Sequence, residues 1–299
     1  MELTQFLASN DALENPEELR RRAHRDGYLF FRALLDKKPL LNVRQQILEL
    51  CRKEGWLADG MDLIDGIAAP GIKWVEPQPE FMKVYYEIMK LEDFHALAHS
   101  PALLGIYQKL FGEEVLVHAR NIARIIFPDN SQFTTPSHQD WIHIQGTQET
   151  YSAWIPLSDC PPELGGLTIL VGSHKEGLIS HHDAYGAGGV GIETDHLPYK
   201  WSSSEFRLGD FVTFHSMTVH KGLHNISRNK IRLSVDFRYQ GASQPVVEGS
   251  IKPHYGTQTW EEIYRGWKST QYQYYWTKYN LNLVPYDGSY FSPREKVDQ

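Results

Sequence analysis

The pattern of apolar and polar positions predicts that the first third of the chain is mostly helical. Helix-forming segments alternate there with turn residues, and Gly27 ends the first of them before a short aromatic strand at 28–32. Residues 58–79 are rich in Gly, Ala, Pro and Asp and have no clear period, so we expect a long loop near a pocket. Helices are expected over 16–26, 38–55 and 81–111, the last broken near Ser100-Pro101.

After residue 114, short apolar runs bounded by turn residues predict β-strands. Helices do not alternate with these strands, which favours an antiparallel sandwich or jelly roll over a parallel sheet. We therefore expect a mainly β fold with flanking helices, a double-stranded β-helix (jelly roll, cupin-like). A single domain is expected over 1–299, with a helical part (1–112), a jelly-roll core (about 113–240) and an aromatic-rich C-terminal extension (241–299). The predicted strands are 115–117, 122–127, 151–157, 167–171, 211–214 and 231–239.

The run at 231–239 alternates strictly between apolar and polar side chains. Such a strand places its apolar side against covering helices when the inner face of the jelly roll carries a polar site. The polar side chains should then point inward. The apolar set is Ile231, Leu233, Val235, Phe237 and Tyr239, and the polar set is Arg232, Ser234, Asp236 and Arg238.

The last sixty residues are dense in aromatic side chains. Trp260, Tyr264 and Trp267 have the i, i+4, i+7 spacing of one helix face. We expect a helix packed on the barrel or a subunit contact, as in a homodimer, in preference to a platform for stacking a substrate.

Composition and charge narrow the partners. The 299 residues carry a net charge of −7, so a nucleic-acid backbone is a poor partner, and the run Arg20-Arg21-Arg22 is expected to be a solvated helix face. Two cysteines are too few for a disulfide framework and indicate a reducing compartment. The N-terminus does not have the pattern of a signal peptide, and no apolar stretch approaches the roughly 20 residues that cross a bilayer. A cytoplasmic protein without a membrane partner is expected.

The chemistry is indicated by a His-x-Asp step and a distant histidine. His138 and Asp140 lie two residues apart, and His220 follows eighty residues after the aspartate. Two imidazoles and one carboxylate on one face of a metal leave the other face open, which suits a non-haem iron(II) centre that binds a cosubstrate and dioxygen. By itself a His-x-Asp step is usually structural, so the surrounding residues decide its value.

Arg232 lies twelve residues after His220, and Ser234 faces the same way on the predicted strand. A dicarboxylate cosubstrate bound to iron at one end needs a charged fork for its far carboxylate, which arginine supplies. Alternatively, Arg232 pairs with a nearby acid, Asp236 or Asp159. The spacing favours the cosubstrate.

With these residues in view, the chain resembles the phytanoyl-CoA dioxygenase family of iron(II)- and 2-oxoglutarate-dependent oxygenases. The order and spacing of the matching stretches within 26–239 make the resemblance specific, and only the C-terminal aromatic region falls outside. The stretches are Asp26-Gly27-Tyr28-Leu29, Pro136-Ser137-His138-Gln139-Asp140, 152–157 continuing to 165–175, and 209–220 with Asn225 and Arg232.

The resemblance implies an enzyme that uses Fe(II), 2-oxoglutarate and O2 to oxidise, most often to hydroxylate, an unactivated C–H bond of a small-molecule metabolite, releasing succinate and CO2. The carboxylate of Asp140 argues against halogenation, because related halogenating enzymes have a small residue there. It also implies these roles: His138, Asp140 and His220 as iron ligands; Arg232, Ser234 and Trp154 at the cosubstrate, with Thr168, Gln139 and either Asn121 or Arg124 as further contacts.

One departure from the family pattern follows the distal histidine, where Lys221 and Leu223 replace small residues and His224 is a rival ligand. The run from Gly209 to His215 places the ligand at His220, and His215 is expected to support the fold.

Substrate contacts are less visible. The candidates are Trp141 and His143, which follow the metal motif directly, and Arg124. Tyr151 with the segments 58–79 and 181–201 could frame an entrance. Glycines within 181–201 suggest a lid or, equally, a plain surface excursion. A small to medium polar substrate is expected.

Two other functions remain open at this point. A cosubstrate-independent jelly-roll metalloenzyme would share the three metal ligands but have no use for Arg232, and a non-catalytic ligand-binding protein on this fold would not depend on iron.

Overall fold

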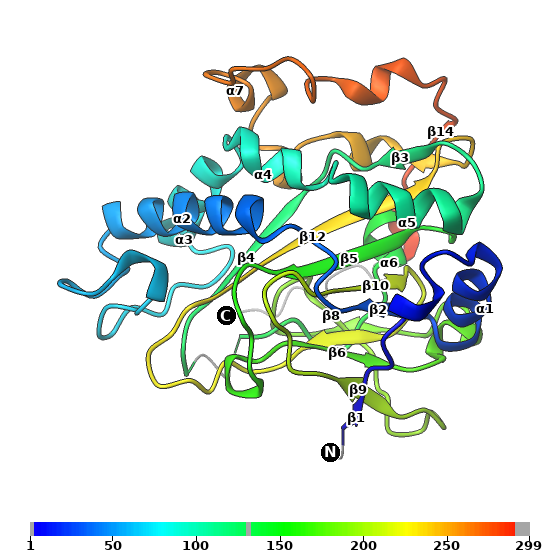
Figure 1. Ribbon diagram of the computed structural model, residues 1–299, viewed down its shortest axis with the longest axis horizontal. Coiled ribbons are helices and arrows are strands. Elements are labelled where there is room, and N and C mark those ends of the chain that lie inside the picture. Colours follow the sequence, from blue (N-terminus) through cyan, green and yellow to red (C-terminus); the bar gives the residue numbers. More distant parts are fainter. Residues whose placement is uncertain (1–2, 130–132, 291–299) are drawn as a thin grey trace.

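Two antiparallel sheets form the centre of the molecule, and helices cover one of them (Figure 1). The computed structural model describes residues 3–129 and 133–290. Within these residues the larger sheet has the order β2-β10-β5-β12-β3, with β4 also paired to β12. Its strands are β2 (Tyr28–Phe31), β10 (Phe211–His215), β5 (Tyr151–Pro156), β12 (Arg232–Gly241), β3 (Val115–Val117) and β4 (Ile122–Ile126).

The smaller sheet has the order β1-β9-β6-β11 and packs against the open face of the larger one. Only the β1–β9 pair is parallel among the described strands of these two sheets. This arrangement confirms the predicted jelly roll. The strands are β1 (Thr4–Gln5), β9 (Trp201–Ser203), β6 (Leu167–Leu170) and β11 (His220–Gly222), and short pairs form from β7 (His182–Asp183) with β8 (Val190–Gly191) and β13 (Val246–Val247) with β14 (Leu283–Val284).

The expected helices are present, with the third region divided in three. Asn15 caps the first helix by accepting from the backbone N–H of Glu18, and Gly27 ends it in the left-handed conformation that glycine favours. The α-helices are α1 (Pro16–Asp26), α2 (Lys37–Lys53), α3 (Pro79–Ile88), α4 (Glu92–Leu97), α5 (Pro101–Phe111), α6 (Trp141–Ile144) and α7 (Trp260–Ile263). Short 3-10 turns occupy Asn10–Ala12, Leu63–Asp65, Pro162–Leu164, Ser173–Glu176, Glu248–Ile251, His254–Gly256, Tyr275–Lys278 and Gly288–Tyr290.

Strand β12 has the two faces that its alternation predicted. On the outer face Phe237 meets Phe94 of α4, and Tyr239 stacks on Tyr107 of α5 with 3.8 Å between ring centroids. On the inner face Arg232, Asp236 and Arg238 line a cavity between the two sheets. Hydrophobic burial therefore fixes the register of the strand, and the register brings its charged residues to the inside.

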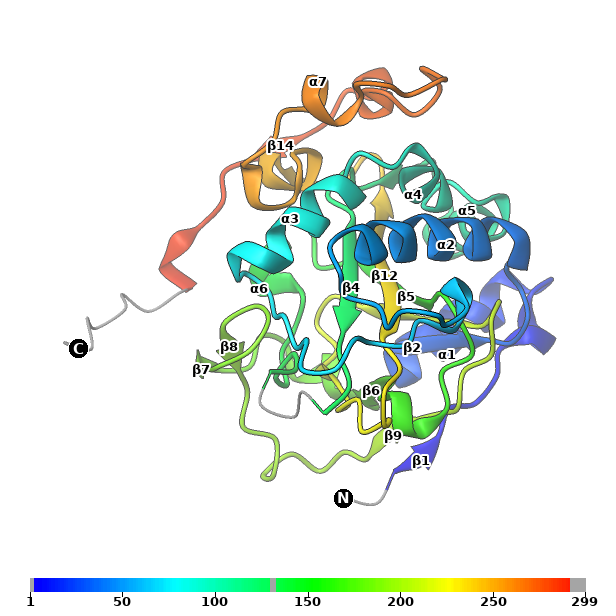
Figure 2. The same ribbon diagram turned by 90° about the vertical axis from the view of Figure 1, so that its left-hand side faces the viewer.

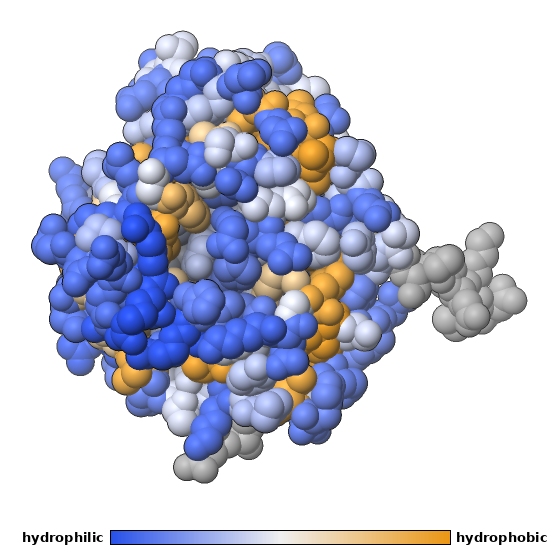
Figure 3. Space-filling view, turned by 90° about the vertical axis from the view of Figure 1, so that its right-hand side faces the viewer, coloured by the Kyte–Doolittle hydropathy of each residue, from blue (hydrophilic) through white to orange (hydrophobic). Residues whose placement is uncertain are grey.

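The N-terminal part is not separate from the jelly roll. Strand β2 pairs with β10 and the first residues of the chain pair with β9, so the sheets include segments from before residue 112. The arginines of α1 form ion pairs at the surface, Arg21 with Glu18 and Arg22 with Asp11, as expected for a solvated helix face. On this side of the molecule hydrophilic side chains cover most of the surface, and hydrophobic ones form separate patches (Figure 3).

The predicted C-terminal helix is much shorter than its aromatic spacing suggested. Helix α7 ends at Ile263, so Trp267 is not on it, and the left-handed Gly266 (φ 93°) prevents continuation. The rings still pack in sequence, Trp260 on Tyr264 and Tyr264 on Trp267. Trp267 donates through Nε1 to the carbonyl of Lys90, which fastens this layer over the helices (Figure 2). Among the described residues, no helix has the length and apolar character needed to cross a membrane.

Candidate metal centre

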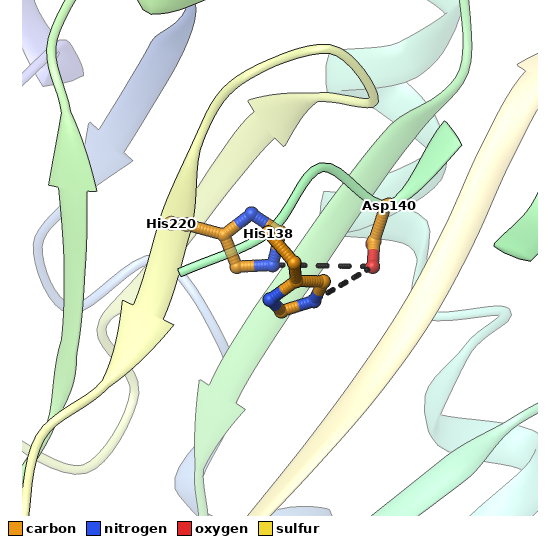
Figure 4. A group of neighbouring side chains, drawn as sticks. All are labelled: His138, Asp140 and His220. Carbon is orange, nitrogen blue, oxygen red and sulfur yellow. Dashed lines mark ion pairs between the residues drawn. The ribbon is translucent and has the colours of Figure 1, made fainter. Parts of the chain in front are cut away.

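His138, Asp140 and His220 converge inside the jelly roll (Figure 4). His138 lies just before α6, Asp140 is the residue before its first turn, and His220 begins β11. The two histidines form a backbone pair, each N–H donating to the carbonyl of the other at 3.0 Å. Pairing of the main chain therefore places both rings side by side, with 4.2 Å between their centroids.

Hydrogen bonds aim the ring nitrogens at the carboxylate. Nδ1 of His138 donates to the carbonyl of Pro136 at 2.8 Å, and Nδ1 of His220 donates to that of Thr218 at 3.0 Å. Because these carbonyls can only accept, each Nε2 is left with a free lone pair. The Nε2 atoms of His138 and His220 lie 3.5 and 3.9 Å from Oδ1 of Asp140.

The protonation states also suit a metal. Burial lowers the pKa of His220 to about 3, so its ring is neutral at neutral pH. Burial alone would raise the pKa of Asp140, but Arg238 and the two histidines hold it well below its usual range. Two imidazoles and one carboxylate, all buried and with ligand atoms within 4.8 Å of one another, form the donor set of a non-haem iron site.

Two residues hold the carboxylate of Asp140 from behind. Arg238 donates from Nε to Oδ2 at 3.3 Å and from a terminal nitrogen to Oδ1 at 3.2 Å, and Ser152 donates to Oδ2. Neither residue was predicted to have a role. The alternation of β12 predicted that Arg238 points into the barrel. The spacing along the sequence did not indicate that it would reach Asp140.

Arg232 and Trp154 line the same cavity as the three metal-binding candidates. The guanidinium carbon of Arg232 lies 5.7 Å from the centre of the Trp154 ring, and its terminal nitrogen is 3.4 Å from the hydroxyl of Ser234. Nε of Arg232 is buried with no hydrogen-bond partner in the described part of the chain. A buried donor of this kind fits a bound anion such as the far carboxylate of 2-oxoglutarate.

The local-acid alternative for Arg232 is wrong in this structure. Asp236 accepts instead from Arg124 at 3.0 Å, and Asp159 accepts from the backbone N–H of Leu208. Over residues 3–129 and 133–290, no ion pair of Arg232 is present.

Three of the further cosubstrate candidates do not line the cavity. The Thr168 hydroxyl donates to the carbonyl of Ser202 in the neighbouring strand. The amide of Gln139 donates to the carbonyls of Gly177 and Met217. Both side chains hold neighbouring backbone segments together in this structure, and a contact with the cosubstrate stays a prediction.

Asn121 is also turned away from the cavity. Its side-chain nitrogen contacts Nδ1 of the buried His95 at 3.1 Å, on the helical side of the sheet. Arg124, the other candidate on that strand, does line the cavity, and it bridges Asp236 and Glu76. Asn121 directly precedes β4, and in extended backbone positions 121 and 124 point to opposite faces.

Trp141 and His143 lie in α6, beside the cavity but not in its lining. The ring of His143 is 6.0 Å from that of His138, and burial lowers the pKa of His143 to about 3. The Trp141 ring packs edge-on against Tyr290. A contact of either side chain with a substrate stays a prediction.

The rival ligand His224 is exposed, so the structure brings His220 and not His224 to the centre. His215 packs against Tyr151, and its Nδ1 accepts from the N–H of Met217. Tyr151 itself is buried beneath Phe111 and does not frame an entrance.

A second cavity adjoins the first and shares Arg124, Ile126 and Thr135 with it. Val75 and Glu76 from the loop 58–79 and Ala187 from the segment 181–201 also line it. Both segments therefore contribute residues to a space next to the cavity of the metal centre. Glu76 was not anticipated, because it meets Arg124 only through the tertiary fold.

Sequence comparison identifies the family. Residues 23–234 match the model of the phytanoyl-CoA dioxygenase (PhyH) family. The chain belongs to the phytanoyl-CoA dioxygenase family. This family member is an Fe(II)- and 2-oxoglutarate-dependent oxygenase, and its His-Asp-His group lies in the jelly roll as that activity requires.

Two curated relatives are bacterial hydroxylases. The oxygenase is 30% identical to the 1-deoxypentalenic acid 11-beta-hydroxylase of Streptomyces arenae over 248 residues, covering 77% of this chain and 83% of that one. It is 27% identical to the enzyme of the same name from Streptomyces exfoliatus over 255 residues, covering 81% and 87%. Among solved structures, the epimerase SnoN in complex with Fe3+, alpha ketoglutarate and nogalamycin RO matches with a TM-score of 0.54 at 19% identity, covering 77% and 85%, which supports the fold.

Proposed function

We propose that this oxygenase hydroxylates an unactivated C–H bond of a small-molecule metabolite, with His138, Asp140 and His220 holding Fe(II). The observation that carries the proposal is the buried, unpartnered Nε of Arg232 in the same cavity as the three ligands. A buried cation without an acid requires an anionic ligand, and 2-oxoglutarate supplies one. The related bacterial enzymes that hydroxylate 1-deoxypentalenic acid support the reaction type.

When bound, the iron with its cosubstrate supplies the oxidising chemistry. The side chains of the protein hold the iron ligands and the cosubstrate in position. Arg232 and Ser234 hold the far carboxylate of 2-oxoglutarate, and Trp154 flanks it with an apolar ring that limits its orientations. Ser152 and Arg238 fix the ligand carboxylate of Asp140.

The substrate reaches the centre through the second cavity, where Arg124 faces both spaces. The walls mix the rings of Phe81 and Phe133 with the charges of Arg124 and Glu76. Such a lining suits a compact substrate with an apolar body and a polar group. The enclosing loops exclude water from the reacting atoms, which favours coupled turnover.

The cosubstrate-independent alternative has no use for Arg232, and the non-catalytic alternative has no use for the metal ligands. A cytoplasmic location and a homodimer stay predictions of the sequence.

The test is anaerobic addition of Fe(II) and then 2-oxoglutarate, with the visible charge-transfer band of the chelate as the readout. The native protein should show the band, His138→Ala should lose it, and Arg232→Ala should need far more 2-oxoglutarate to reach it. The exposed Arg228→Ala serves as the matched control. A band that forms equally well in Arg232→Ala would contradict the assigned role of the arginine.

A further inference from the structure

Helix α6, which follows the proposed ligand Asp140, is too short to be stable by itself. It is a single turn of four residues, and helices of that length depend on contacts from outside. Gln145, which ends it, has φ 47° and ψ −151°, a backbone conformation that favours glycine. Other parts of the chain must therefore hold this turn, and with it the backbone of Asp140.

The side chain of Gln145 pairs with the main chain of Asp287, near the end of the described chain. Its amide nitrogen donates to the carbonyl of Asp287 at 2.8 Å, and its amide oxygen accepts from the N–H of Asp287 at 2.7 Å. Gln145 is buried, so its amide has little access to water as an alternative partner. The two bonds offset the strain at Gln145, and a glycine, which this backbone would favour, could not make them.

The neighbouring Tyr286 supports the same turn. Its hydroxyl donates to the carbonyl of Ile142 at 3.2 Å. The last carbonyls of a helix have no partner within it, so this bond satisfies one of the free acceptors of α6. Trp141, the first residue of the turn, packs edge-on against Tyr290 with 5.2 Å between ring centroids. Residues 286–290, here named the C-terminal strap, therefore contact both ends of α6.

The strap also holds the segment 181–201. The carbonyl of Tyr290 accepts from Nε2 of His181 at 2.6 Å, and His181 directly precedes the hairpin of β7 and β8. The hairpin in turn meets α6, because a Cβ at Gly188 would lie 3.3 Å from Nε2 of His143. In both ribbon views the last described part of the chain, drawn in red, returns to α6 (Figures 1 and 2). The strap, α6 and the hairpin therefore form one group of contacts.

This group borders the metal centre and the space beside it. Ile192, just after β8, donates its backbone N–H to the carbonyl of Ser137 at 2.8 Å, next to the proposed ligand His138. Ala187, between the two strands of the hairpin, lines the second cavity. The strap is therefore attached to two elements, one that carries Asp140 and one that encloses the proposed path of the substrate.

The strap itself is weakly held. Residues 286–289 are exposed, so they bury little apolar surface, and hydrogen bonds provide most of their contacts. Segments with few buried apolar contacts open locally at a small free-energy cost. The pairing of β14 with β13 holds the chain just before the strap. The strap can therefore separate from α6 while the rest of the fold stays intact.

We propose that the C-terminal strap is a latch on the entrance to the metal centre, and that Gln145 and Tyr286 are the positioning residues that close it. This inference rests on the proposed function, because the entrance is the one that its substrate uses. The closed strap holds α6 and keeps the hairpin beside the second cavity. Its release lets these two walls move apart and admit the substrate. A latch of this kind retains a small substrate during oxidation and limits the entry of water.

Hydrogen exchange of the metal-free protein tests the latch without any ligand. Gln145→Leu removes both bonds to the strap, and Tyr286→Phe removes the bond to α6. Each change should speed exchange of the amides in 137–145 and 181–192 by at least about fivefold, the effect of losing one or two hydrogen bonds. Amides of the central strand β5 should exchange at the native rate, since only the entrance opens.

Two substitutions of the same types serve as matched controls. Gln45→Leu on α2 and Tyr272→Phe each remove one side-chain hydrogen bond at the surface and should exchange like the native protein. Tyr286→Phe removes a single hydroxyl from an exposed residue, so the test stands even if the buried Gln145→Leu does not fold. Native exchange rates over both ranges in every strap variant that folds overturn the inference.

Removal of Fe(II) by excess 2,2′-bipyridine provides a second readout. Both strap variants should lose iron at least about fivefold faster than the native protein at a temperature well below unfolding. A merely structural role would lower the melting temperature but leave iron loss from the folded protein at the native rate, which also overturns the inference. Failure of the native protein to bind Fe(II) contradicts the proposed function, whereas exchange in the metal-free protein decides the latch independently.

Discussion

Arg238 and Ser152 are directly opposite each other on strands β12 and β5, and both donate to the carboxylate of Asp140. Oδ2 receives Ser152 and Nε of Arg238, while Oδ1 receives one bond and faces the two imidazole nitrogens. The pair thereby leaves Oδ1 as the oxygen that would hold a metal together with the two imidazoles. A carboxylate held in this way would bind through one oxygen and leave more of the metal free for the cosubstrate.

Arg238→Met should weaken Fe(II) binding by about tenfold or more, since partners that orient a metal ligand typically contribute 10–100-fold to affinity. Ser152→Ala removes one neutral donor and should have a smaller effect. Anaerobic titration with Fe(II) measures both constants. Unchanged affinity in Arg238→Met would show that the two histidines and Asp140 hold their geometry without help.

Arg232→Lys should raise the KM for 2-oxoglutarate by roughly 10–100-fold, because lysine keeps the charge but loses the two-pronged contact and the buried Nε donor. With saturating cosubstrate, kcat should fall much less. Succinate release at varied 2-oxoglutarate concentration separates the two constants. Arg228→Lys at the surface provides the control, and a change confined to kcat would argue against the assigned contact.

The stability of the protein should fall as the pH drops from about 6.5 toward 4. Burial lowers the pKa of His95 and His118 to about 4 and that of His99 to about 3, from 6.5. The unfolded chain therefore takes up protons first, and each histidine reduces the free energy of unfolding by up to about 1.4 kcal/mol per pH unit in this window.

Urea unfolding at pH 7.5 and pH 5 tests this expectation. His118→Gln should reduce the pH dependence by the share of one buried histidine, while the exposed His196→Gln should leave it unchanged. An identical pH dependence in His118→Gln and the native protein would contradict the assignment.

Gly165→Ala should destabilise the protein by about 1–3 kcal/mol more than Gly55→Ala. Both glycines have positive φ, 70° and 72°, so both substitutions strain the backbone. A Cβ at Gly165 would collide with the carbonyl oxygens of Leu223 and His224, whereas nothing lies within 4 Å at Gly55. Thermal unfolding measures the difference. Equal losses would mean that the loop after β11 moves aside without penalty.

The elements with strong periodicity or clear end signals were predictable. Asn15, Pro16 and Gly27 define the first helix locally, and the alternation of β12 sets which side chains enter the barrel. The metal-binding group was also recognisable, because His138, Asp140 and His220 are residue types that bind iron and they stand in a recognisable order and spacing along the chain.

Other features depend on which segments meet in space. Strands β9 and β11 have three residues each, too few for a period, and exist through their pairing with β6. Gln139 looked like a ligand contact from its place between His138 and Asp140, but its side chain points to the opposite side. The bridge from Glu76 to Arg124 joins residues that no local pattern relates.

The mutual backbone pair of His138 and His220 links residues more than eighty positions apart. Closing a loop of that length has a large entropic penalty, which is recovered only when the intervening strands are already in place. The metal site therefore cannot form early in folding. During synthesis the nascent chain has no complete binding site until β11 has emerged from the ribosome. Iron therefore binds only at a late stage of folding and stabilises only the chains that have reached that stage.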